Sequence, residues 1–268
     1  ERLKDMEVIL DELTSPDADD LVAEVTCDEP ILLNPGAEDG EGKLLPRLAA
    51  IDCGVKHNIL RELCTRFQVV WCPADMPLDE ITRDWSPDAL FASNGPGDPA
   101  HPGAATDARR TLAAAVRQGM PVMGICLGHQ LMGLAAGLRT YKLRYGHRGS
   151  NQPVMDLESG QVHITSQNHG FAVEDPVQGM LAPHPSGSCS EETENVLGAE
   201  FRVRYVNSND RTVEGLDLLD KPAFTIQFHP EACPGPHDAS PLFDRFQKIV
   251  SDHLGYVGPE LISNEGGS

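Results

Sequence analysis

The sequence has no uninterrupted apolar run of the length that a membrane span needs, which is about 20 residues. Its first ten residues include five charged ones and lack the apolar stretch of a signal peptide. We therefore expect a soluble, cytoplasmic protein that does not use a membrane as a partner. The chain starts with Glu1 and not with Met, which favours a fragment of a longer polypeptide.

Basic residues are also scarce. Lys and Arg number 21 against 41 Asp and Glu, which gives a formal net charge of -20, and only six of the 21 are Lys. A surface that binds nucleic acid needs clustered Lys and Arg, so the composition argues against nucleic acid as a partner. The acidic excess resembles that of salt-adapted proteins, which stay soluble under heavy screening.

Several ligand-binding patterns are missing. None of the seven cysteines forms a C-x-x-C pair, so the sequence predicts no metal site and no thioredoxin-like site. An odd number of cysteines without a secretion signal is typical of free thiols in a reducing compartment. The phosphate-loop spacing G-x-x-x-x-G-K-[ST] is absent too, so we expect no nucleotide cofactor on this chain.

Short apolar runs alternate with amphipathic stretches from Leu48 onward. This alternation predicts an α/β fold with a mostly parallel central sheet flanked by helices. The expected strands and helices, in chain order, are 48–52 (strand), 58–67 (helix), 68–72 (strand), 78–83 (helix), 89–93 (strand), 104–118 (helix), 121–125 (strand) and 128–136 (helix).

After Gly137 the pattern favours β-structure. We expect two hairpins, then a strong strand and a closing helix, with a polar loop over 183–195. The ranges are 154–156 with 161–165, 201–207 with 212–216, 223–228 and 242–254.

Three units follow from this organisation. Residues 1–46, with a helical pattern over 3–13 and a Gly/Glu-rich stretch over 35–42, contain too little apolar material for a core of their own. They are either the remnant and linker of a preceding N-terminal domain or a segment that wraps the main one. Residues 47–254 form the main domain, and 255–268 are expected to be a flexible tail.

The strongest chemical motif is Gly-Ile-Cys-Leu-Gly at 124–128, which follows an apolar strand and opens a helix. This is the context of a nucleophile elbow, here with Cys126 in place of serine. Flanking glycines suit a strained turn, and a helix N-terminus favours the thiolate, which is the reactive form. The alternative is an ordinary tight turn with a buried cysteine.

A thiol nucleophile needs a base and a group that orients the base. His229 ends the expected strand 223–228 and is followed by Pro230 and Glu231, which is near enough to hold the imidazole in one tautomer. The nucleophile precedes the histidine, as in α/β-hydrolase-like chains. A strand-end histidine paired with a surface glutamate is the alternative. A Gly/Pro-dense loop, 93–99, also follows a strand, and its glycine N–H groups suit an oxyanion hole.

Together these residues resemble the class I glutamine amidotransferases, and within them the carbamoyl-phosphate synthase small chains. The resemblance extends from about residue 48 to 250. The general family is marked by GICLGHQ at 124–130, HPE at 229–231 and NGPG at 94–97. The subgroup is marked by YGHRGSNQPV at 145–154, by TSQNHGF at 165–171 and by HPEACPGPHDA at 229–239, and the 52–59 segment resembles the same family.

The resemblance implies a glutamine-hydrolysing enzyme that passes ammonia to a large synthetase subunit, which makes carbamoyl phosphate from bicarbonate and ATP. ATP and magnesium are then expected on the large subunit and no cofactor on this chain. The implied catalytic residues are Cys126, His229 and Glu231. Those implied to surround L-glutamine are Gly95, Gly97, Leu127, Gln130, Asn168, Gly170 and Phe171, with Gly95 and Leu127 also offering oxyanion-hole N–H groups.

Some features depart from the family or leave other readings open. The family has a complete N-terminal domain and usually has Ser where Cys233 stands, and the stretch around 186–200 resembles an insertion relative to its shorter members. We expect His129 to be structural. The alternatives are an amidotransferase serving GMP, CTP or anthranilate synthesis, and a non-catalytic regulatory subunit of the same fold. A cysteine peptidase is disfavoured because the amidotransferase loop accompanies the elbow.

Overall fold

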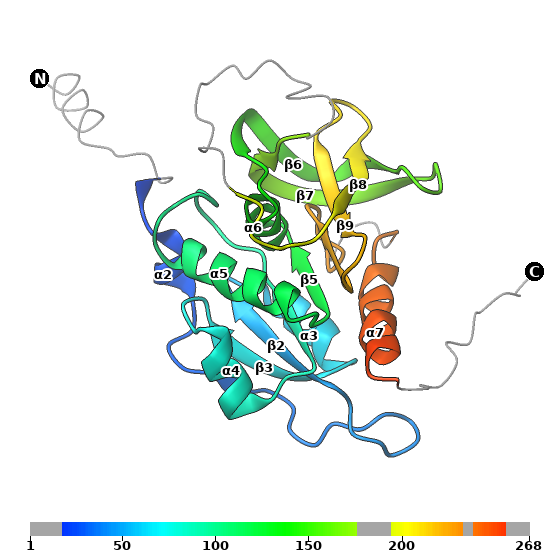
Figure 1. Cartoon of the computed structure of the whole chain (residues 1–268). Helices are drawn as coiled ribbons and strands as arrows, with labels where there is room; N and C mark the ends of the chain where they lie inside the picture. The colour runs from blue at the N-terminus through cyan, green and yellow to red at the C-terminus, as the bar shows by residue number, and fades with distance from the viewer. Residues whose placement is uncertain (1–17, 176–193, 233–237, 256–268) are drawn as a thin grey trace, which may run out of the picture.

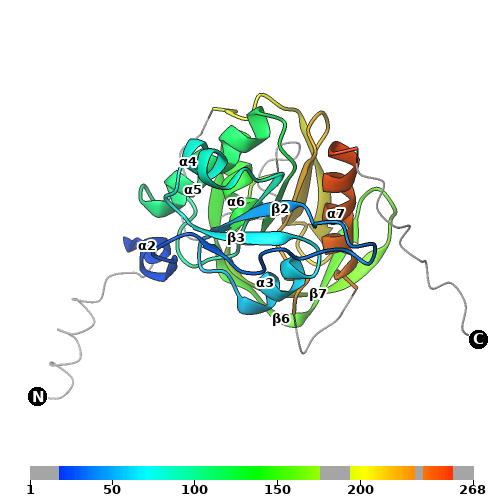
Figure 2. The same cartoon turned by 90° about the horizontal axis from the view of Figure 1, so that it is seen from below.

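The computed structural model describes residues 18–175, 194–232 and 238–255 of the chain. Within them one ten-stranded sheet runs through the molecule, with helices on both faces of its central part (Figures 1 and 2). The strand order is β1-β3-β2-β4-β5-β10-β9-β7-β6-β8. The strands are β1 (Ile31–Leu32), β2 (Arg47–Asp52), β3 (Gln68–Pro73), β4 (Ala89–Ala92), β5 (Val122–Ile125), β6 (Thr140–Asp156), β7 (Val162–Val173), β8 (Phe201–Asn207), β9 (Val213–Leu218) and β10 (Ala223–Ile226).

The predicted α/β fold is confirmed, but the prediction of a mostly parallel sheet holds only for its centre. Strands β3, β2, β4, β5 and β10 are neighbours and pair in parallel. All other pairings are antiparallel, so the sheet as a whole is mixed and not mostly parallel, and the pairs of β6 with β7 and of β8 with β9 are those of the two predicted hairpins. Short connections join β6 to β7, β8 to β9 and β9 to β10, and connections of this length permit only antiparallel neighbours.

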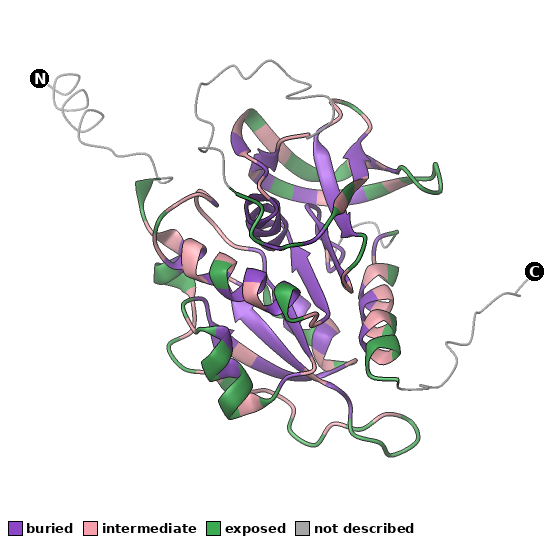
Figure 3. Ribbon diagram, viewed as in Figure 1, coloured by how far each residue is buried: buried purple, intermediate pink, exposed green. Residues whose placement is uncertain are grey.

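The helices divide between the two faces of the parallel strands. Helices α4, α5 and α6 pack on the face that carries Ile51 and Leu90, whereas α3 and α7 pack on the face that carries Leu48 and Phe91. Both faces are covered, so the central strands are buried apolar runs (Figure 3). The helices are α2 (Leu21–Val25), α3 (His57–Cys64), α4 (Leu78–Trp85), α5 (Ala104–Arg117), α6 (Leu127–Ala135) and α7 (Pro241–His253).

The antiparallel half holds both predicted hairpins. Met155 pairs with Val162 in the first, and Val206 pairs with Val213 in the second. The strands of the first hairpin are much longer than predicted, since β6 has 17 residues and β7 has 12. Strand β8 pairs with both β6 and β9, so strands β6 to β9 curl back on themselves.

The described part of the N-terminal segment, residues 18–46, lies along the sheet. Ile31 of β1 pairs with Trp71 of β3. The Asn34 amide donates to the carbonyl oxygens of Cys64 and Phe67 at 3.0 and 2.8 Å. This segment therefore extends the parallel half of the sheet by one short strand. The predicted helix at 3–13, most of the loop over 183–195 and nearly all of the tail lie outside the described residues.

No helix within the described ranges is both long enough and apolar enough to span a membrane.

Candidate active site

Cys126 occupies a strained turn between β5 and α6. Its backbone has φ 55° and ψ −100°, a left-handed region that few residues other than glycine adopt. Its N–H donates to the carbonyl of Ile226 in β10 at 2.8 Å, which anchors the turn to the neighbouring strand. Such strain persists only where the surroundings hold it in place, and it is common at functional sites.

The glycines on either side of Cys126 are required by close backbone approach. A Cβ built on Gly128 would lie 2.2 Å from the carbonyl oxygen of Ala92, and one on Gly124 would lie 2.8 Å from the carbonyl of Gly128. The N–H of Gly128 donates to the carbonyl of Ser93 at 3.0 Å. The start of α6 thus packs directly on the end of β4, which brings the 94–97 loop beside Cys126.

His229 and Glu231 lie against this turn. The Nδ1 atom of His229 is 2.8 Å from Oε1 of Glu231, and a hydrogen bond joins the His229 side chain to that of Cys126. Since Nδ1 is bonded to the carboxylate, Nε2 is the atom left for the thiol. His229 and Glu231 are 4% and 5% exposed, so the three side chains interact away from bulk water.

Lys56, to which the sequence assigned no role, completes this cluster. Its Nζ lies 3.3 Å from Oε1 of Glu231 and 3.1 Å from Nδ1 of His229. An ammonium group and a protonated Nδ1 are both donors, so we assign the Lys56 contact to the carboxylate and the Nδ1 hydrogen to Glu231. The only signal in the sequence was the position of Lys56 within the 52–59 segment.

Both titratable partners of the thiol are shifted toward their charged forms. Burial lowers the pKa of His229, but its hydrogen bonds and charge interactions with Cys126 and Glu231 outweigh burial and raise the pKa from 6.5 to about 9. Burial raises the pKa of Glu231, but His229 and then Lys56 lower it below its usual value. The site therefore favours an imidazolium between a carboxylate and the thiol.

The raised pKa of His229 predicts a pH-dependent stability. The stabilisation is fully present below pH 6.5, the unfolded value, and is lost as the pH rises through about 9. Its size is at most about 3 kcal/mol. Denaturant unfolding of the wild type and of His229→Gln should differ most near pH 6 and least above pH 9. A difference that does not change with pH would contradict the assignment.

A cavity of about 420 Å³ opens beside Cys126. All the residues predicted to surround glutamine line this cavity, with the exception of Leu127. The side chain of Leu127 is buried, and Leu127 is the first residue of α6. The lining residues are Leu21, Gly54, Lys56, Asn94, Gly95, Pro96, Gly97, Cys126, Gln130, Lys142, Arg148, Asn168, His169, Gly170, Phe171 and His229.

Two walls of this cavity are held by hydrogen bonds. On one side, a Cβ on Gly95 would lie 2.0 Å from the carbonyl oxygen of Cys53, and the Asn94 side chain bonds the backbone of Gly54 and Lys56 at 3.0 and 3.1 Å. The glycine-rich loop is thus packed onto the turn after β2. This contact explains why position 95 must be glycine.

The opposite wall is the 168–171 segment of β7. Nε2 of Gln130 donates to the carbonyl of Phe171 at 2.9 Å and to Oε1 of Gln227 at 3.0 Å. The Gln130 amide nitrogen is therefore used to hold the wall. His129, expected to be structural, is buried away from the cavity with Nδ1 2.8 Å from the Thr225 hydroxyl. Cys233 lies outside the described residues.

The chain is similar to known proteins in sequence and in fold. The family model of class-I glutamine amidotransferases matches residues 49–249. The carbamoyl phosphate synthase small chain of Syntrophotalea carbinolica is 44% identical over 239 residues, which cover 86% of this chain and 57% of that protein. The small chain of Methanopyrus kandleri is 46% identical over 209 residues, which cover 78% and 52%. The chain thus spans about half the length of the curated relatives it matches.

A solved structure shows a similar fold. It is a protein of Thermoplasma acidophilum assigned as one of the subunits of GMP synthase, with a TM-score of 0.60 and 18% identity, and the match covers 79% of this chain and 96% of that one. Identity at this level concerns the fold alone.

Proposed function

The chain belongs to the class-I glutamine amidotransferase family, and on this premise we propose that it hydrolyses L-glutamine as the small subunit of a carbamoyl-phosphate synthase. One observation carries the proposal most. A thiol in a strained strand-to-helix turn lies beside a histidine that is hydrogen-bonded to a buried carboxylate, and the thiol and the histidine line the same cavity. This arrangement supports the interpretation of 124–128 as a nucleophile elbow and of Cys126, His229 and Glu231 as a triad.

In the first half of the reaction, the Cys126 thiolate attacks the side-chain carbonyl carbon of glutamine. The oxygen takes up the negative charge and accepts hydrogen bonds from the N–H groups of Gly95 and Leu127. When the tetrahedral intermediate collapses, the C–N bond breaks. The imidazolium of His229 gives its proton to the departing nitrogen, which leaves as ammonia, and a glutamyl thioester remains on Cys126.

In the second half, water loses a proton to His229 and its oxygen attacks the thioester carbon. Collapse of the second tetrahedral intermediate releases glutamate and leaves the Cys126 side chain as a thiolate, beside a protonated His229. Glu231 stays ionised throughout and holds Nδ1–H, so that Nε2 faces the thiol in both steps. Lys56 lowers the pKa of Glu231, which supports the ionised form of that carboxylate.

We propose that glutamine occupies the cavity between the glycine-rich loop and β7. Gly95 and Gly97 would contact it from the loop, and Asn168, Gly170 and Phe171 from the strand, since all five line the cavity. The contacts of the Gln130 amide nitrogen support a second role for that residue. By holding the carbonyl of Phe171, it sets the distance between Cys126 and the far wall.

The partner in this proposal is a large synthetase subunit, which would carry the ATP and magnesium and receive the ammonia. Residues 47–254 would form the amidotransferase domain, and 1–46 the end of a preceding domain with its linker. A reactive thiol and the free cysteines of the described residues suit a reducing compartment, which supports a cytoplasmic location.

Mixing the chain with a carbamoyl-phosphate synthase large subunit, bicarbonate and ATP tests the subgroup. We expect glutamine-dependent carbamoyl phosphate formation, and faster glutamine hydrolysis with the large subunit than without it. A GMP- or CTP-forming synthetase serves as the matched partner control. Transfer of ammonia to one of those, with none to the large subunit, would overturn the subgroup and leave glutamine hydrolysis intact.

A further inference from the structure

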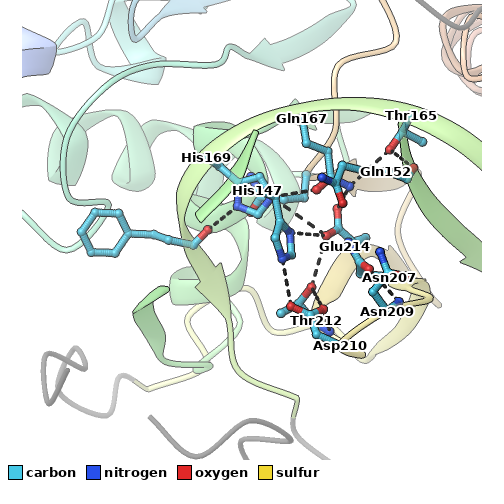
Figure 4. A network of polar contacts seen from close by, with 12 residues as sticks. His147, Gln152, Thr165, Gln167, His169, Asn207, Asn209, Asp210, Thr212 and Glu214 are labelled. Carbon is cyan, nitrogen blue, oxygen red and sulfur yellow. Dashed lines mark hydrogen bonds and ion pairs between the residues drawn. The ribbon is translucent and has the colours of Figure 1, made fainter. Parts of the chain in front are cut away.

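A second buried cluster of ionisable side chains lies in the antiparallel half of the sheet. It contains His147 of β6, His169 of β7 and Glu214 of β9 (Figure 4). His147 and His169 are directly paired across the two strands, so their side chains share one face. The side chains of His147, His169 and Glu214 are 14%, 2% and 0% exposed.

The potential ligand atoms of these residues converge. Oε1 of Glu214 lies 3.4 Å from Nδ1 of His147 and 3.9 Å from Nε2 of His169, and the three atoms all lie within 4.8 Å of one another. Tetrahedral zinc, with bonds of about 2.0–2.1 Å to nitrogen and oxygen, places neighbouring ligand atoms about 3.3 Å apart. If the separations between these atoms shortened by a few tenths of an ångström to about 1.5 Å, all three atoms would reach bonding distance of one zinc ion.

The outer contacts orient each group toward the centre. Nε2 of His147 is 2.9 Å from Oδ2 of Asp210, and Nδ1 of His169 is 2.8 Å from the carbonyl oxygen of Phe171. Oε2 of Glu214 accepts from the Gln167 amide at 2.9 Å. Metal-binding histidines almost always donate their outer N–H to a carboxylate or carbonyl in this manner.

The ring nitrogens that face the centre of this cluster have no suitable hydrogen-bond partners among the described residues. The carbonyl of Phe171 only accepts, so His169 carries its hydrogen on Nδ1, and its Nε2 presents a lone pair to Oε1 of Gln167, 3.2 Å away. The Gln167 amide cannot be turned round without losing its donation to Glu214. Nδ1 of His147 is buried and makes no hydrogen bond to any of the described residues.

We propose that His147, His169 and Glu214 form a binding site for a divalent transition metal of the zinc class. Two imidazoles and one carboxylate are a known zinc ligand set, and a cation at the centre satisfies the lone pair of His169 Nε2, which otherwise faces the oxygens of Gln167 and Glu214. The metal would join β6, β7 and β9 directly behind the cavity wall, since His169 holds the carbonyl of Phe171. Its role is structural.

A proton is the rival occupant. Burial lowers the pKa of His147, but Asp210 and Glu214 outweigh burial and raise it to about 9. The same two carboxylates that attract a metal therefore also hold a proton on this imidazole, and metal binding must displace it. The sequence predicted no metal site because the three residues come from separate strands without any close spacing.

Zinc titration of the chelator-treated chain against a competing chelator tests the proposal. We expect one tightly bound zinc in the wild type, and affinity at least about a hundredfold weaker in His147→Ala and in Glu214→Gln. Asp210→Asn should weaken it roughly tenfold through the orientation of His147. His163→Ala, on the same strand as His169, and Cys126→Ala, which removes the reactive thiol, are the controls and should retain the zinc.

Two readouts on the wild type are independent of any variant. Zinc at about 100 times its Kd should raise the unfolding temperature by roughly 5 to 10 °C. X-ray absorption should show only nitrogen and oxygen neighbours at about 2.0–2.2 Å. Sulfur in that shell, zinc binding that His147→Ala leaves unchanged, or no bound zinc at all would overturn the proposal, the last meaning that the cluster holds a proton only.

Discussion

Cys126→Ala is expected to lower the rate of glutamine hydrolysis by roughly a thousandfold or more, because residues of a catalytic triad act as a unit and the covalent route is lost with the nucleophile. The substitution removes one sulfur from a side chain that is 5% exposed, so the fold should persist. Ammonia release from L-glutamine, measured beside the unfolding temperature, separates loss of chemistry from loss of structure.

Cys64→Ala provides the matched control. Cys64 is half-buried on α3, and burial raises the pKa of its thiol, which keeps it unreactive. Its variant should hydrolyse glutamine at the wild-type rate. Equal activity in Cys126→Ala and Cys64→Ala would show that Cys126 is an ordinary buried cysteine in a tight turn.

Gly128→Ala is expected to destabilise the protein and abolish activity together. Its Cβ would lie 2.2 Å from the backbone oxygen of Ala92, and backbone hydrogen bonds from Gly128 to Ser93 and from Cys126 to Ile226 hold the start of the helix against its neighbours. Overpacking a well-packed interior costs about 1–3 kcal/mol, and a clash with backbone lies at or above the upper end. About 3 kcal/mol corresponds to a fall of roughly 6 to 12 °C in unfolding temperature for a chain of this size.

The control for this change is Gly40→Ala. No atom lies within 4 Å of a Cβ at Gly40, so calorimetry should find its unfolding temperature unchanged. If Gly128→Ala unfolds at the wild-type temperature, the close packing of α6 on β4 is not what holds the turn at Cys126. Normal stability with reduced activity would instead mean that the turn shifts at little energetic cost.

The parallel half of the fold was predictable because its strands are short apolar runs that alternate with helical stretches. Boundaries in this half differ from prediction by at most three residues, and several agree. The turn at Cys126 was predictable for the same reason, since the glycines at 124 and 128 mark where β5 and α6 meet. Here local sequence pattern and tertiary packing favour the same structure.

The long strands β6 and β7 were missed for a physical reason. Gly146 and Gly149 adopt positive φ and interrupt the alternation of apolar and polar residues. The pairing shifts register between Lys142 and His147 and again between Gly149 and Gln152, which is typical of bulges. Strands β6 and β7 form because they pair with each other, and a local sequence pattern does not reveal that pairing.

The contacts of Lys56 and the cluster around Glu214 were missed for a related reason. Lys56 meets Glu231 across 175 positions of sequence, and Glu214 meets His147 across 67. Such contacts depend on how β2, β6, β7, β9 and β10 are ordered in the sheet. The family resemblance supplied the residues of the proposed glutamine pocket, but not the bond by which Gln130 holds its far wall.

Peptide mapping after reaction with a chloroketone analogue of L-glutamine tests the central claim most directly. The account predicts one adduct, on the peptide that contains Cys126, formed before any of the other six thiols react and suppressed by excess L-glutamine. His229→Gln should slow its formation, because the imidazolium that stabilises the thiolate is gone. Equal labelling of several cysteines, or an adduct at Cys126 that glutamine does not suppress, would contradict a glutamine-hydrolysing site at this turn.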